Sequence, residues 1–586
     1  MVAPFVLLDD TTPEGPAARL YRAPVAVIEA REPEAVRPAL EAVRAGVARG
    51  LNAAGFLAYE AGSGIEPRIA AAGMPAEPLV WFGLFKDFET IARGEVPARL
   101  PDPGGAWAAA PEPAIDRAAY DARLARVLEL IAAGDIYQAN LTFAAEVRFA
   151  GDPLALYARL RGQARAGYGA VIATGAETIL SLSPELFFRL DGDRLLARPM
   201  KGTATRGDSA DADRAAIARL AGDAKQRAEN LMIVDLIRND LSCVAAPGSV
   251  ETPALFRVET YPTVHQMVSD VTATLVSGQD AVDVLTALFP CGSITGAPKI
   301  RASEVIAEIE DAPRGVYTGA IGRIDATGDA AFNVAIRTLV IADEGVARIG
   351  LGSGIVADSR SGEEWAECLA KGAFVGTGQP RFDLIETMAF DPEQGIPLLE
   401  RHLARMKASA IHFGFPFDRH ATRNELQAAT FRLREARRIR LLLGPSGAIA
   451  IQVSPMPPTP SAPVEVAVVR HPLDARDFRL AHKTSNRAFY NEARSAAGVF
   501  EIVMVDGDEF LTEGSFTSVF VERDGVLVTP PLARGLLPGV LRAELIESGR
   551  AIEGDLTPAD LAGGFFIGNA LRGLIPAVAV ANGLGL

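Results

Sequence analysis

Short apolar runs alternate with turn-forming residues along most of the chain, which predicts a protein built from both strands and helices. Before residue 105, runs such as FVLL, GFLAYEAG and PLVWFGLF are separated by Gly, Pro and acidic residues. From 136 to 375, strand-like runs such as AFNVAIRTLVIA alternate with helical runs such as KIRASEVIAEIED. Apolar runs of this length, bounded by turn formers, are typical of buried strands with helices between them. We therefore expect an α+β fold.

One helix is predicted to begin after Asp116, whose side chain can cap the free N–H groups of the first turn. The apolar residues that follow fall on one helical face: Tyr120, Leu124, Val127, Leu128 and Ile131. Gly134 suits the left-handed conformation that ends many helices. The preceding segment PDPGGAWAAAPEPAI (101–115) is rich in Pro, Gly and Ala and is predicted to be a connection.

Two breaks in the pattern predict how the chain is divided. Gly and Pro residues in VGTGQPR (375–381) interrupt it first. We expect one domain over 1–378, with its core at 115–375, and a second over 382–586. The Pro-rich segment SPMPPTPSAP (454–463) is predicted to separate two lobes of the second domain. A length of 586 residues exceeds what one hydrophobic core supports.

Composition and charge restrict the function. The chain is 49% hydrophobic and 22% charged, which is typical of a globular protein, and its net charge is −15. We expect no nucleic-acid or anionic-membrane partner, because either requires a basic surface. The three cysteines are widely spaced, no apolar stretch is long enough to span a bilayer, and the N-terminus does not resemble a signal peptide. The sequence therefore predicts a cytoplasmic enzyme.

A hairpin with a lysine at its end is the first candidate site. The segment SLSPELFFRLDGDRLLARPMKGTATRG (181–207) reads as two strands joined by a DGD turn. Lys201 is expected at the end of the second strand, next to Gly202, which lets a substrate approach the backbone. Glu185 opens the hairpin. Each residue alone is more simply a solvated surface charge.

The segment QRAENLMIVDLIRNDLS (226–242) carries apolar residues nearly all round a helix, which predicts a buried helix. Buried charges need partners, and Asp235 can pair with Arg238 one turn away. Glu229 has only Lys225 within helical reach.

The segment DSRSGEEWAECLAKG (358–372) predicts a second acidic helix. Ser361 and Glu364 fit a capping box, whereas Glu367 has no such explanation. Two carboxylates from separate helices, Glu229 and Glu367, are a suitable pair for Mg²⁺, with water and substrate filling the other positions. The sequence GLGSG (350–354) lacks a nucleotide-binding spacing and is predicted to be a tight turn that offers backbone N–H groups to a carboxylate.

These motifs together resemble the chorismate-utilising enzymes, the family of anthranilate, isochorismate and aminodeoxychorismate synthases. The matching stretches are GFLAYEAG, GDIYQANLT, SLSPELF, RPMKGTATRG, ENLMIVDLIRNDL, VHQMVSDV, FPCGSITGAPK, YTGAIG, FNVAIRT and GLGSGIVADS. The resemblance implies the family's β-sandwich with flanking helices. A P-I-K-G-T motif marks the aminodeoxychorismate branch, and Met200 replaces its Ile here. Gln138 stands where the isochorismate enzymes carry a water-activating lysine.

The resemblance also implies the chemistry. Lys201 is similar to the nucleophile that attacks C2 of chorismate, Glu185 to the general acid/base, and Glu229 and Glu367 to the Mg²⁺ ligands. A nucleophilic lysine must be neutral, so we expect its pKa to be lowered. The substrate carboxylates are expected at Thr203, Tyr317, Arg337, Gly352 and Gly354. The family's anthranilate branch has His where Gln266 stands, and His265 lies one position early.

A second lysine marks the C-terminal candidate site. Lys483 precedes an amphipathic helix in RLAHKTSNRAFYNEAR, and Glu513 follows a strand and a DGD turn. RGLLPGVLRAELI (534–546) leads into a helix whose first N–H groups suit a phosphate. A Schiff-base lysine, a carboxylate for the pyridine nitrogen and an anion site are what pyridoxal phosphate requires.

This order of motifs resembles fold-type IV pyridoxal-phosphate enzymes, which include branched-chain aminotransferases and aminodeoxychorismate lyase. The resemblance implies that Arg405 contacts the phosphate, that Gly539 and Val540 lie at the phosphate-binding helix start, and that Asn569 lies beside the cofactor. The domain begins abruptly at FDLIETM (382–388), without the leading strand of standalone members. Either the first domain or a partner in a homodimer is expected to complete the fold.

The combined hypothesis is a bifunctional enzyme that makes 4-aminobenzoate for folate biosynthesis. The first domain would aminate chorismate to 4-amino-4-deoxychorismate, and the second would eliminate pyruvate. The sequence has no G-x-C-x-G glutaminase motif, so ammonia is expected from a separate class I glutamine amidotransferase subunit. Two alternatives remain open: an anthranilate-type synthase fused to a class IV aminotransferase, and a non-catalytic chorismate-binding regulator.

Overall fold

The structure is a computed structural model that describes residues 3–12, 15–164, 166–261, 264–343 and 345–580. It divides into two compact units. The first comprises Met1–Leu100, Ala110–Val147 and Tyr157–Thr377. The second comprises Pro101–Ala109, Arg148–Leu156 and Gly378–Leu586. The outermost residues of these ranges, 1–2 and 581–586, lie outside the described residues, as do the corresponding ends of the predicted domains.

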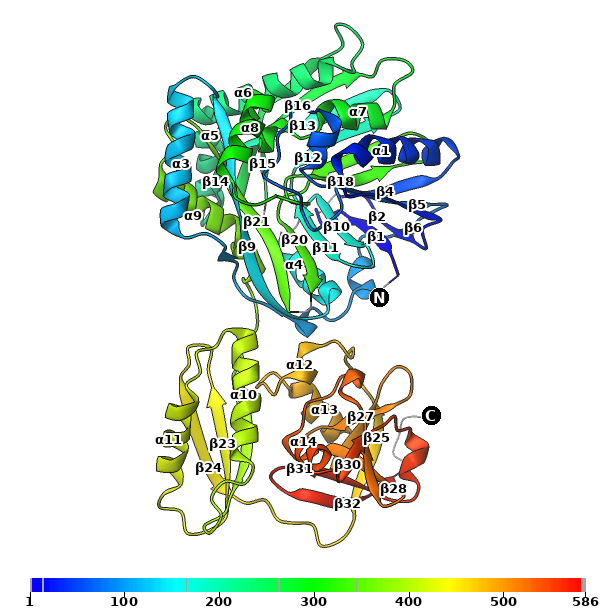
Figure 1. Cartoon of the computed structure of the whole chain (residues 1–586), viewed down its shortest axis with the longest axis vertical. Helices are drawn as coiled ribbons and strands as arrows, with labels where there is room; N and C mark the ends of the chain where they lie inside the picture. The colour runs from blue at the N-terminus through cyan, green and yellow to red at the C-terminus, as the bar shows by residue number, and fades with distance from the viewer. Residues whose placement is uncertain (1–2, 13–14, 165, 262–263, 344, 581–586) are drawn as a thin grey trace. The chain divides into compact units, whose positions relative to one another are not determined.

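Two mostly antiparallel sheets form the first unit (Figure 1). The first sheet has the order β17 (Gly296–Ala297), β9 (Gln138–Gly151), β21 (Val346–Ile355), β20 (Thr338–Asp343), β11 (Thr178–Ser183), β10 (Tyr168–Ala173), β1 (Phe5–Asp9), β2 (Ala18–Arg22) and β6 (Glu89–Ile91). The short β8 (Glu112–Pro113) also pairs with β9.

The second sheet carries the nucleophile candidate at one edge. Its order is β14 (Met200–Thr205), β16 (Val264–Thr274), β13 (Arg194–Arg198), β12 (Leu186–Asp191), β19 (Ala330–Val334), β18 (Ala320–Ile324), β4 (Asn52–Leu57), β5 (Val80–Phe85) and β3 (Ala26–Ala30). β15 (Glu251–Thr260) also pairs with β16.

Alternation along β4 shows how the second sheet is buried on both faces. Ala54 and Phe56 pack in a cluster with Val6, Tyr21 and other residues of the first sheet. Ala53 and Leu57 belong instead to the large cluster that includes helix residues. Since successive side chains of a strand point to opposite faces, one face of the sheet makes a sandwich and the other is covered by helices. The β-sandwich with flanking helices is confirmed.

The helices that contribute to the large cluster are α1 (Pro33–Ala48), α2 (Ala61–Ile65), α6 (Ala224–Ser242) and α7 (Ala281–Leu288). The other helices of the unit are α3 (Arg117–Ala132), α5 (Ala210–Gly222), α8 (Lys299–Ile309) and α9 (Ser361–Gly372), and α4 (Pro153–Ala164) begins in the residues assigned to the second unit. No helix within the described ranges is both long and apolar enough to cross a membrane.

Helix α3 forms largely as predicted. Asp116 caps it by accepting a hydrogen bond from Ala119 N at 2.8 Å, and Gly134 has a φ of 82° just after its end. The buried face contains Tyr120, Leu124, Val127 and Leu130. Leu128 and Ile131, which were predicted on the same face, are only partly buried, whereas Leu130 is also buried.

Two helix predictions need correction. In α6, Asp235 pairs with Arg238 at 2.9 Å as predicted, but both side chains are more than half exposed, so the helix is not buried all round. Its buried acid, Asp240, pairs with Lys299 at 2.6 Å. In α9, the predicted capping box is absent, because the N-cap residue is Arg360 and Ser361 is already helical. Glu364 instead accepts a hydrogen bond from Ser359 Oγ.

The second unit contains two sheets on either side of the Pro-rich segment 456–463. The first has the order β22 (Leu384–Phe390), β23 (Arg437–Leu443) and β24 (Ile449–Pro455), accompanied by α10 (Leu399–Phe413) and α11 (Arg419–Thr430). The second has the order β27 (Leu511–Gly514), β26 (Glu501–Val505), β25 (Val464–Arg470), β32 (Gly573–Val580), β31 (Phe565–Asn569), β28 (Ser518–Arg523), β29 (Val526–Thr529) and β30 (Ala551–Glu553). Three helices accompany it: α12 (Phe478–Ala481), α13 (Ala488–Ala497) and α14 (Val540–Glu547).

Two segments from the N-terminal half of the sequence belong to the second unit. β7 (Ala106–Ala108) pairs with Phe149–Gly151, so 101–115 is more than the predicted connection. Trp107 packs edge-on against Phe413 at a centroid distance of 4.9 Å, in a cluster that also holds Phe382. The N-terminal half of the chain therefore contributes to the C-terminal core, the first of the two possibilities that the sequence left open.

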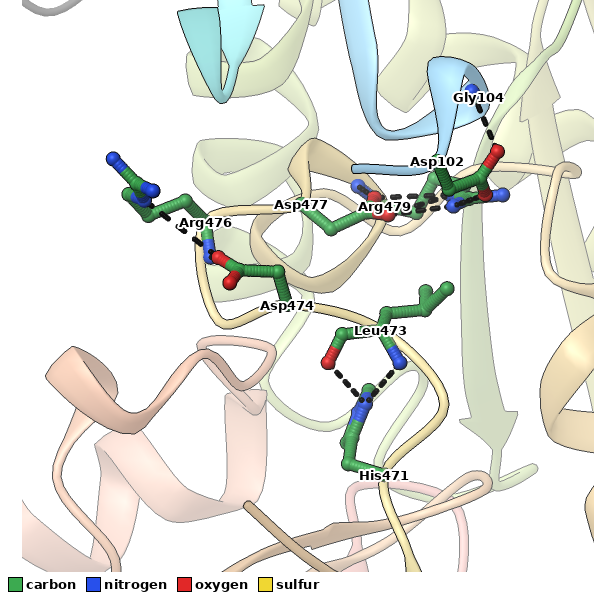
Figure 2. A network of polar contacts seen from close by, with 8 residues as sticks. All are labelled: Asp102, Gly104, His471, Leu473, Asp474, Arg476, Asp477 and Arg479. Carbon is green, nitrogen blue, oxygen red and sulfur yellow. Dashed lines mark hydrogen bonds and ion pairs between the residues drawn. The ribbon is translucent and has the colours of Figure 1, made fainter. Parts of the chain in front are cut away.

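Polar contacts reinforce this arrangement (Figure 2). Arg479 donates to Asp102 at 2.6 Å and also binds Asp477, which is almost completely buried. Arg476 forms an ion pair with Asp152, another buried carboxylate. A buried carboxylate without a cation is costly, so both ion pairs stabilise the packing of the two N-terminal segments within this unit.

Candidate active sites

Lys201 lies inside strand β14 rather than at the end of the hairpin strand. Strand β13 ends at Arg198, because Pro199 has no N–H to donate, and pairing with β16 resumes at Met200 in the same register. A register shift follows within β14, between Met200 and Thr203. Gly202 has a φ of 97°, which favours glycine. The local backbone thus brings Lys201 to the interior side of the sheet edge, which the sequence pattern did not predict.

The ammonium of Lys201 is enclosed by charged groups. Burial lowers its pKa from the ordinary 10.5, and the nearby ammonium of Lys371 lowers it further. The carboxylates of Glu229, Glu185 and Glu367 act in the opposite direction on the same group. The structure therefore brings together four of the residues that the sequence selected, and the lysine is biased toward its neutral, nucleophilic form.

Glu185 is buried, and its Oε1 accepts a hydrogen bond from Ser293 Oγ at 2.7 Å. Burial raises the pKa of this carboxyl above 4.5, while the Ser293 hydrogen bond and Lys201 oppose the rise. A carboxyl whose pKa is raised retains its proton closer to neutral pH, as a general acid requires.

The two proposed metal ligands are each beside a lysine. Glu367 forms an ion pair with Lys371 at 2.8 Å, and Glu229 lies 4.0 Å from Lys225. Burial raises the pKa of Glu229. For Glu367, burial is outweighed by Lys371, which lowers the pKa. Among the described side chains, no group of three or more His, Cys, Asp or Glu residues is arranged to hold a metal ion. A cation here would depend on substrate and water oxygens.

The GLGSG segment was predicted to be a tight turn, and this prediction is wrong. It is part of the continuous strand β21. Its glycines serve close packing. A β-carbon at Gly350 would lie 2.0 Å from the ring of Tyr317, and one at Gly352 would lie 2.6 Å from Thr142. A β-carbon at Gly354 would lie 2.7 Å from Lys201 Nζ and 2.9 Å from Gln138 Nε2. An extended strand does not have the turn geometry that the predicted anion-binding nest requires.

Two site residues were not selected from the sequence as ligands. Lys371 donates to Gly352 O at 2.9 Å and neutralises Glu367. Its spacing of four residues from Glu367 on α9 was the available signal. Gln138 is buried, and its Nε2 has no hydrogen-bond partner within the described structure. An unpaired buried amide beside Lys201 is a group that a substrate can satisfy.

The remaining predicted substrate residues have other surroundings. Tyr317 lines a separate cavity of about 240 Å³ that also includes Thr142 and Glu310. Arg337 has a φ of 51°, and burial lowers its pKa. Thr203 is exposed and donates to Gln266 Oε1 at 3.1 Å.

His265 does not replace the missing histidine. Its Nε2 lies 3.0 Å from Asp213, and its Nδ1 lies 3.0 Å from Thr260 Oγ1. Since neighbouring residues of a strand face opposite sides, His265 points away from the face that carries Gln266.

A cavity of about 560 Å³ in the second unit gathers the C-terminal candidates. Its lining includes the predicted residues Arg405, Lys483, Glu513, Gly539, Val540 and Asn569. Burial lowers the pKa of Lys483 from 10.5 to about 7, and the guanidinium of Arg405 contributes. Roughly half of this amine is therefore neutral at pH 7, compared with a very small fraction for an ordinary lysine.

Glu513 is buried and accepts a hydrogen bond from Tyr490 OH. Burial raises the pKa of this carboxyl to about 7. Burial disfavours the ionised form of this carboxyl. A protonated pyridine nitrogen beside it would stabilise that form, so the site suits the predicted cofactor.

Arg405 is anchored at three nitrogens. Its Nε and Nη2 donate to Glu386 at 2.8 and 2.7 Å, and its Nη1 donates to Pro538 O at 2.9 Å. Two of its five N–H groups remain available for an anion. Helix α14 begins at Val540 beside it, with Gly539 as its N-cap, so its first N–H groups line the same cavity.

Two residues hold the loops around the cavity. Asn569 donates to Phe516 O at 3.1 Å and accepts from Leu571 N and Arg572 N. Glu501 is completely buried and accepts hydrogen bonds from Ser515, Phe516 and Thr517. Sequence reasoning missed Glu501, although a single acid opening the apolar strand EIVMV was a signal.

Comparison with known proteins agrees with this organisation. The chorismate binding enzyme family matches residues 3–376, and the class IV aminotransferase family matches residues 383–580. Aminodeoxychorismate synthase component 1 of Salmonella typhimurium is 43% identical over 255 residues, which are 44% of this chain and 56% of that protein. Anthranilate synthase component 1 of Haloferax volcanii is 38% identical over 292 residues, which are 49% and 55% of the two chains.

A solved structure is also similar to a large part of this chain. Anthranilate synthase component I from Streptococcus pneumoniae has a TM-score of 0.54 and 25% sequence identity, and the match covers 62% of this chain and 93% of that one. The chain spans only about half the length of the two curated relatives, since the matched segments are 56% and 55% of those proteins.

Proposed function

The chain belongs to the chorismate binding enzyme family and carries a class IV aminotransferase domain after it, and we propose that it is a bifunctional 4-aminobenzoate enzyme. In this proposal the first unit converts chorismate and ammonia to 4-amino-4-deoxychorismate and water. The second unit then converts that product to 4-aminobenzoate and pyruvate. The observation that carries the first step is the enclosed Lys201 amine with its lowered pKa among Glu185, Glu229 and Glu367.

The first step uses Lys201 as a nucleophile. Its Nζ forms a bond to C2 of the ring, both double bonds of the ring diene shift by one position, and the C4 hydroxyl takes up a proton and leaves as water. Ammonia then forms a bond to C4, both double bonds shift back, and the lysine amine departs from C2. Glu185 is suited to give the leaving hydroxyl its proton, because burial raises its pKa.

We propose that Glu229 and Glu367 hold Mg²⁺ against a substrate carboxylate. The two carboxylates flank Lys201, and their present partners, Lys225 and Lys371, are side chains that can move aside. Mg²⁺ keeps waters and substrate oxygens in its coordination shell, so two protein ligands suffice. When bound, the ion would neutralise charge on the substrate.

The lysine also separates this proposal from its nearest competitor. Anthranilate synthases belong to the same family and are among the relatives, and their motif resembles P-I-A-G-T without a lysine. The relative from Salmonella typhimurium bears the aminodeoxychorismate name. The name component 1 supports a separate partner that supplies ammonia, for which we propose a glutamine amidotransferase subunit.

The cavity of the second unit fits pyridoxal phosphate by its donor set. It offers an amine with a pKa of about 7, a buried carboxyl at Glu513, a helix start at Val540, and free N–H groups on Arg405. The cofactor supplies an electron sink for the carbon that bears the amine. Lys483 would remove the proton from C4 and return one to the departing enolpyruvate carbon, while Glu513 holds the pyridine end in place.

One assay tests both steps. Purified protein with chorismate, Mg²⁺, pyridoxal phosphate and an ammonium salt should release 4-aminobenzoate and pyruvate. Lys483→Ala should accumulate 4-amino-4-deoxychorismate, and Lys201→Ala should fail to form it while keeping the visible absorbance of the cofactor. Accumulation of anthranilate by the unaltered protein would sink the assignment. Transamination without pyruvate release would replace the lyase step by an aminotransferase.

A further inference from the structure

The cavity of the second unit contains more positive charge than its own carboxylates balance. Six arginines line it, and Arg405 is paired with Glu386. In the described structure, none of the other five forms an ion pair with a carboxylate: Arg438, Arg440, Arg487, Arg494 and Arg572. The chain as a whole is acidic, with 73 acidic and 58 basic residues, so the excess of positive charge is local to this cavity. Unpaired guanidinium groups gathered in one cavity indicate an anionic ligand.

The arginines fall into two groups. Arg405, Arg487 and Arg440 are the cations that act on Lys483. They are the group available to the phosphate of the proposed cofactor. Arg438 and Arg494 act instead on Arg572, whose pKa is lowered first by burial and then by these two like charges, while the buried carboxyl of Glu501 opposes them. This second group, Arg438, Arg494 and Arg572, thus has three positive charges against the one carboxyl of Glu501, an excess that an anionic ligand would balance.

Each member of the second group is held by a different element. Arg438 is on β23, where its Nε donates to Ser454 Oγ at 2.9 Å. Arg494 is on α13, with its guanidinium 5.1 Å from the ring centroid of Phe516. Arg572 lies in the turn between β31 and β32, where Asn569 accepts its backbone N–H at 3.0 Å. Side chains presented by three separate elements converge on one side of the cavity.

Aromatic contacts fix the guanidinium of Arg572. It lies 5.3 Å from the ring centroid of Phe516 and 5.9 Å from that of Phe500. Its Nε is buried without a hydrogen-bond partner among the described residues. A planar guanidinium that is stacked and has a free N–H is prepared to bind a carboxylate.

We propose that Arg438, Arg494 and Arg572 form a carboxylate-binding subsite that selects ligands with an amine and a carboxylate at opposite ends of a six-membered ring. This inference rests on the proposed function, because it names how the same cavity chooses its substrate. In 4-amino-4-deoxychorismate and in 4-aminobenzoate the ring carboxylate lies opposite the amine. With the amine directed to Lys483, that carboxylate reaches the second group of arginines, and the ring lies beside Phe516.

The test is binding to the full-length protein with pyridoxal phosphate, measured by calorimetry. 4-Aminobenzoate is compared with 4-aminobenzamide, which has the same shape without the charge. The unaltered protein should bind the carboxylate at least about tenfold more tightly than the amide. In the double variant Arg494→Gln/Arg572→Gln the preference should disappear. Arg432→Gln, which removes an exposed arginine of the same unit outside the cavity, should leave it intact.

The outcomes separate this inference from the proposed function. A double variant that keeps the preference, or an unaltered protein that lacks it, overturns the subsite. If the preference exists but no 4-aminobenzoate is released in the coupled assay, the proposed function fails and the subsite stands. The conservative variants Arg494→Lys and Arg572→Lys guard against loss of folding. They keep the charge without the planar fork, and each should weaken the preference partially while the cofactor absorbance remains.

Discussion

Gly354 leaves the space that the Lys201 ammonium occupies, because a β-carbon at that position would lie only 2.7 Å from Lys201 Nζ. The same β-carbon would lie 2.9 Å from Gln138 Nε2. The two strands β21 and β14 belong to different sheets, so this contact defines where the two sheets meet at the site.

Gly354→Ala should therefore impair amination without unfolding the protein. The added methyl group meets the flexible ends of two side chains rather than backbone, so they shift and the nucleophile is displaced. Misplacement of a reacting group by about 1 Å costs about a hundredfold in rate. Steady-state kinetics of chorismate consumption measure this loss. Gly162→Ala, where a β-carbon meets open space, is the matched control and should retain full activity.

The pH dependence of cofactor capture should report the environment of Lys483. Only the neutral amine reacts, and burial lowers its pKa to about 7. The rate at which the apoprotein acquires the visible absorbance of pyridoxal phosphate should rise with pH and level off above about pH 7. A rate that continues to rise toward pH 10 would show an ordinary, solvated lysine and contradict this assignment.

Replacing Glu501 should weaken the cofactor site from outside the cavity. Its two carboxylate oxygens accept hydrogen bonds from Ser515, Phe516 and Thr517. In Glu501→Gln an NH₂ group replaces one of these oxygens, so it faces hydrogen-bond donors and cannot accept from them. Each lost hydrogen bond to a buried charge costs about 1.5–3 kcal/mol, so Glu501→Gln should raise the dissociation constant for pyridoxal phosphate at least tenfold. Formation of 4-amino-4-deoxychorismate should be unchanged. Glu509→Gln, at an exposed position, serves as the control, and equal cofactor binding by both variants would refute the role.

Trp107 should stabilise the unit that binds the cofactor, although it is distant from that unit in sequence. Its ring packs against Phe413 at 4.9 Å, so Trp107→Ala should lower the free energy of unfolding by about 2–4 kcal/mol, less than for a fully buried residue. Thermal loss of the cofactor absorbance measures the effect. Phe431→Ala removes an aromatic ring that is 75% exposed and should leave the transition in place. An unchanged transition in Trp107→Ala would mean that the N-terminal segment does not stabilise this unit.

Local sequence determined the features that depend on a few neighbouring residues. Asp116 caps α3 as predicted, and Gly192 makes the turn between β12 and β13. The family motifs identified Lys201 and Lys483 and predicted the fold around each. This was possible because the reactive side chains are part of the short motifs by which the families are recognised. The break near residue 377 also followed from Gly and Pro alone.

Tertiary structure decided everything that depends on partners far apart in the chain. GLGSG reads as a turn in isolation but becomes a strand, because it continues β21, which lies between β9 and β20 in the first sheet. Ser361 does not cap α9, because the helix already begins at this residue, and its hydroxyl donates instead to Asp121 on another helix. Trp107 joins the core around Phe413 through packing that no sequence period encodes. Lys201 itself was evident from its motif, but the lowered pKa that suits it to the proposed nucleophilic role comes from burial beside Lys371, which only the folded chain provides.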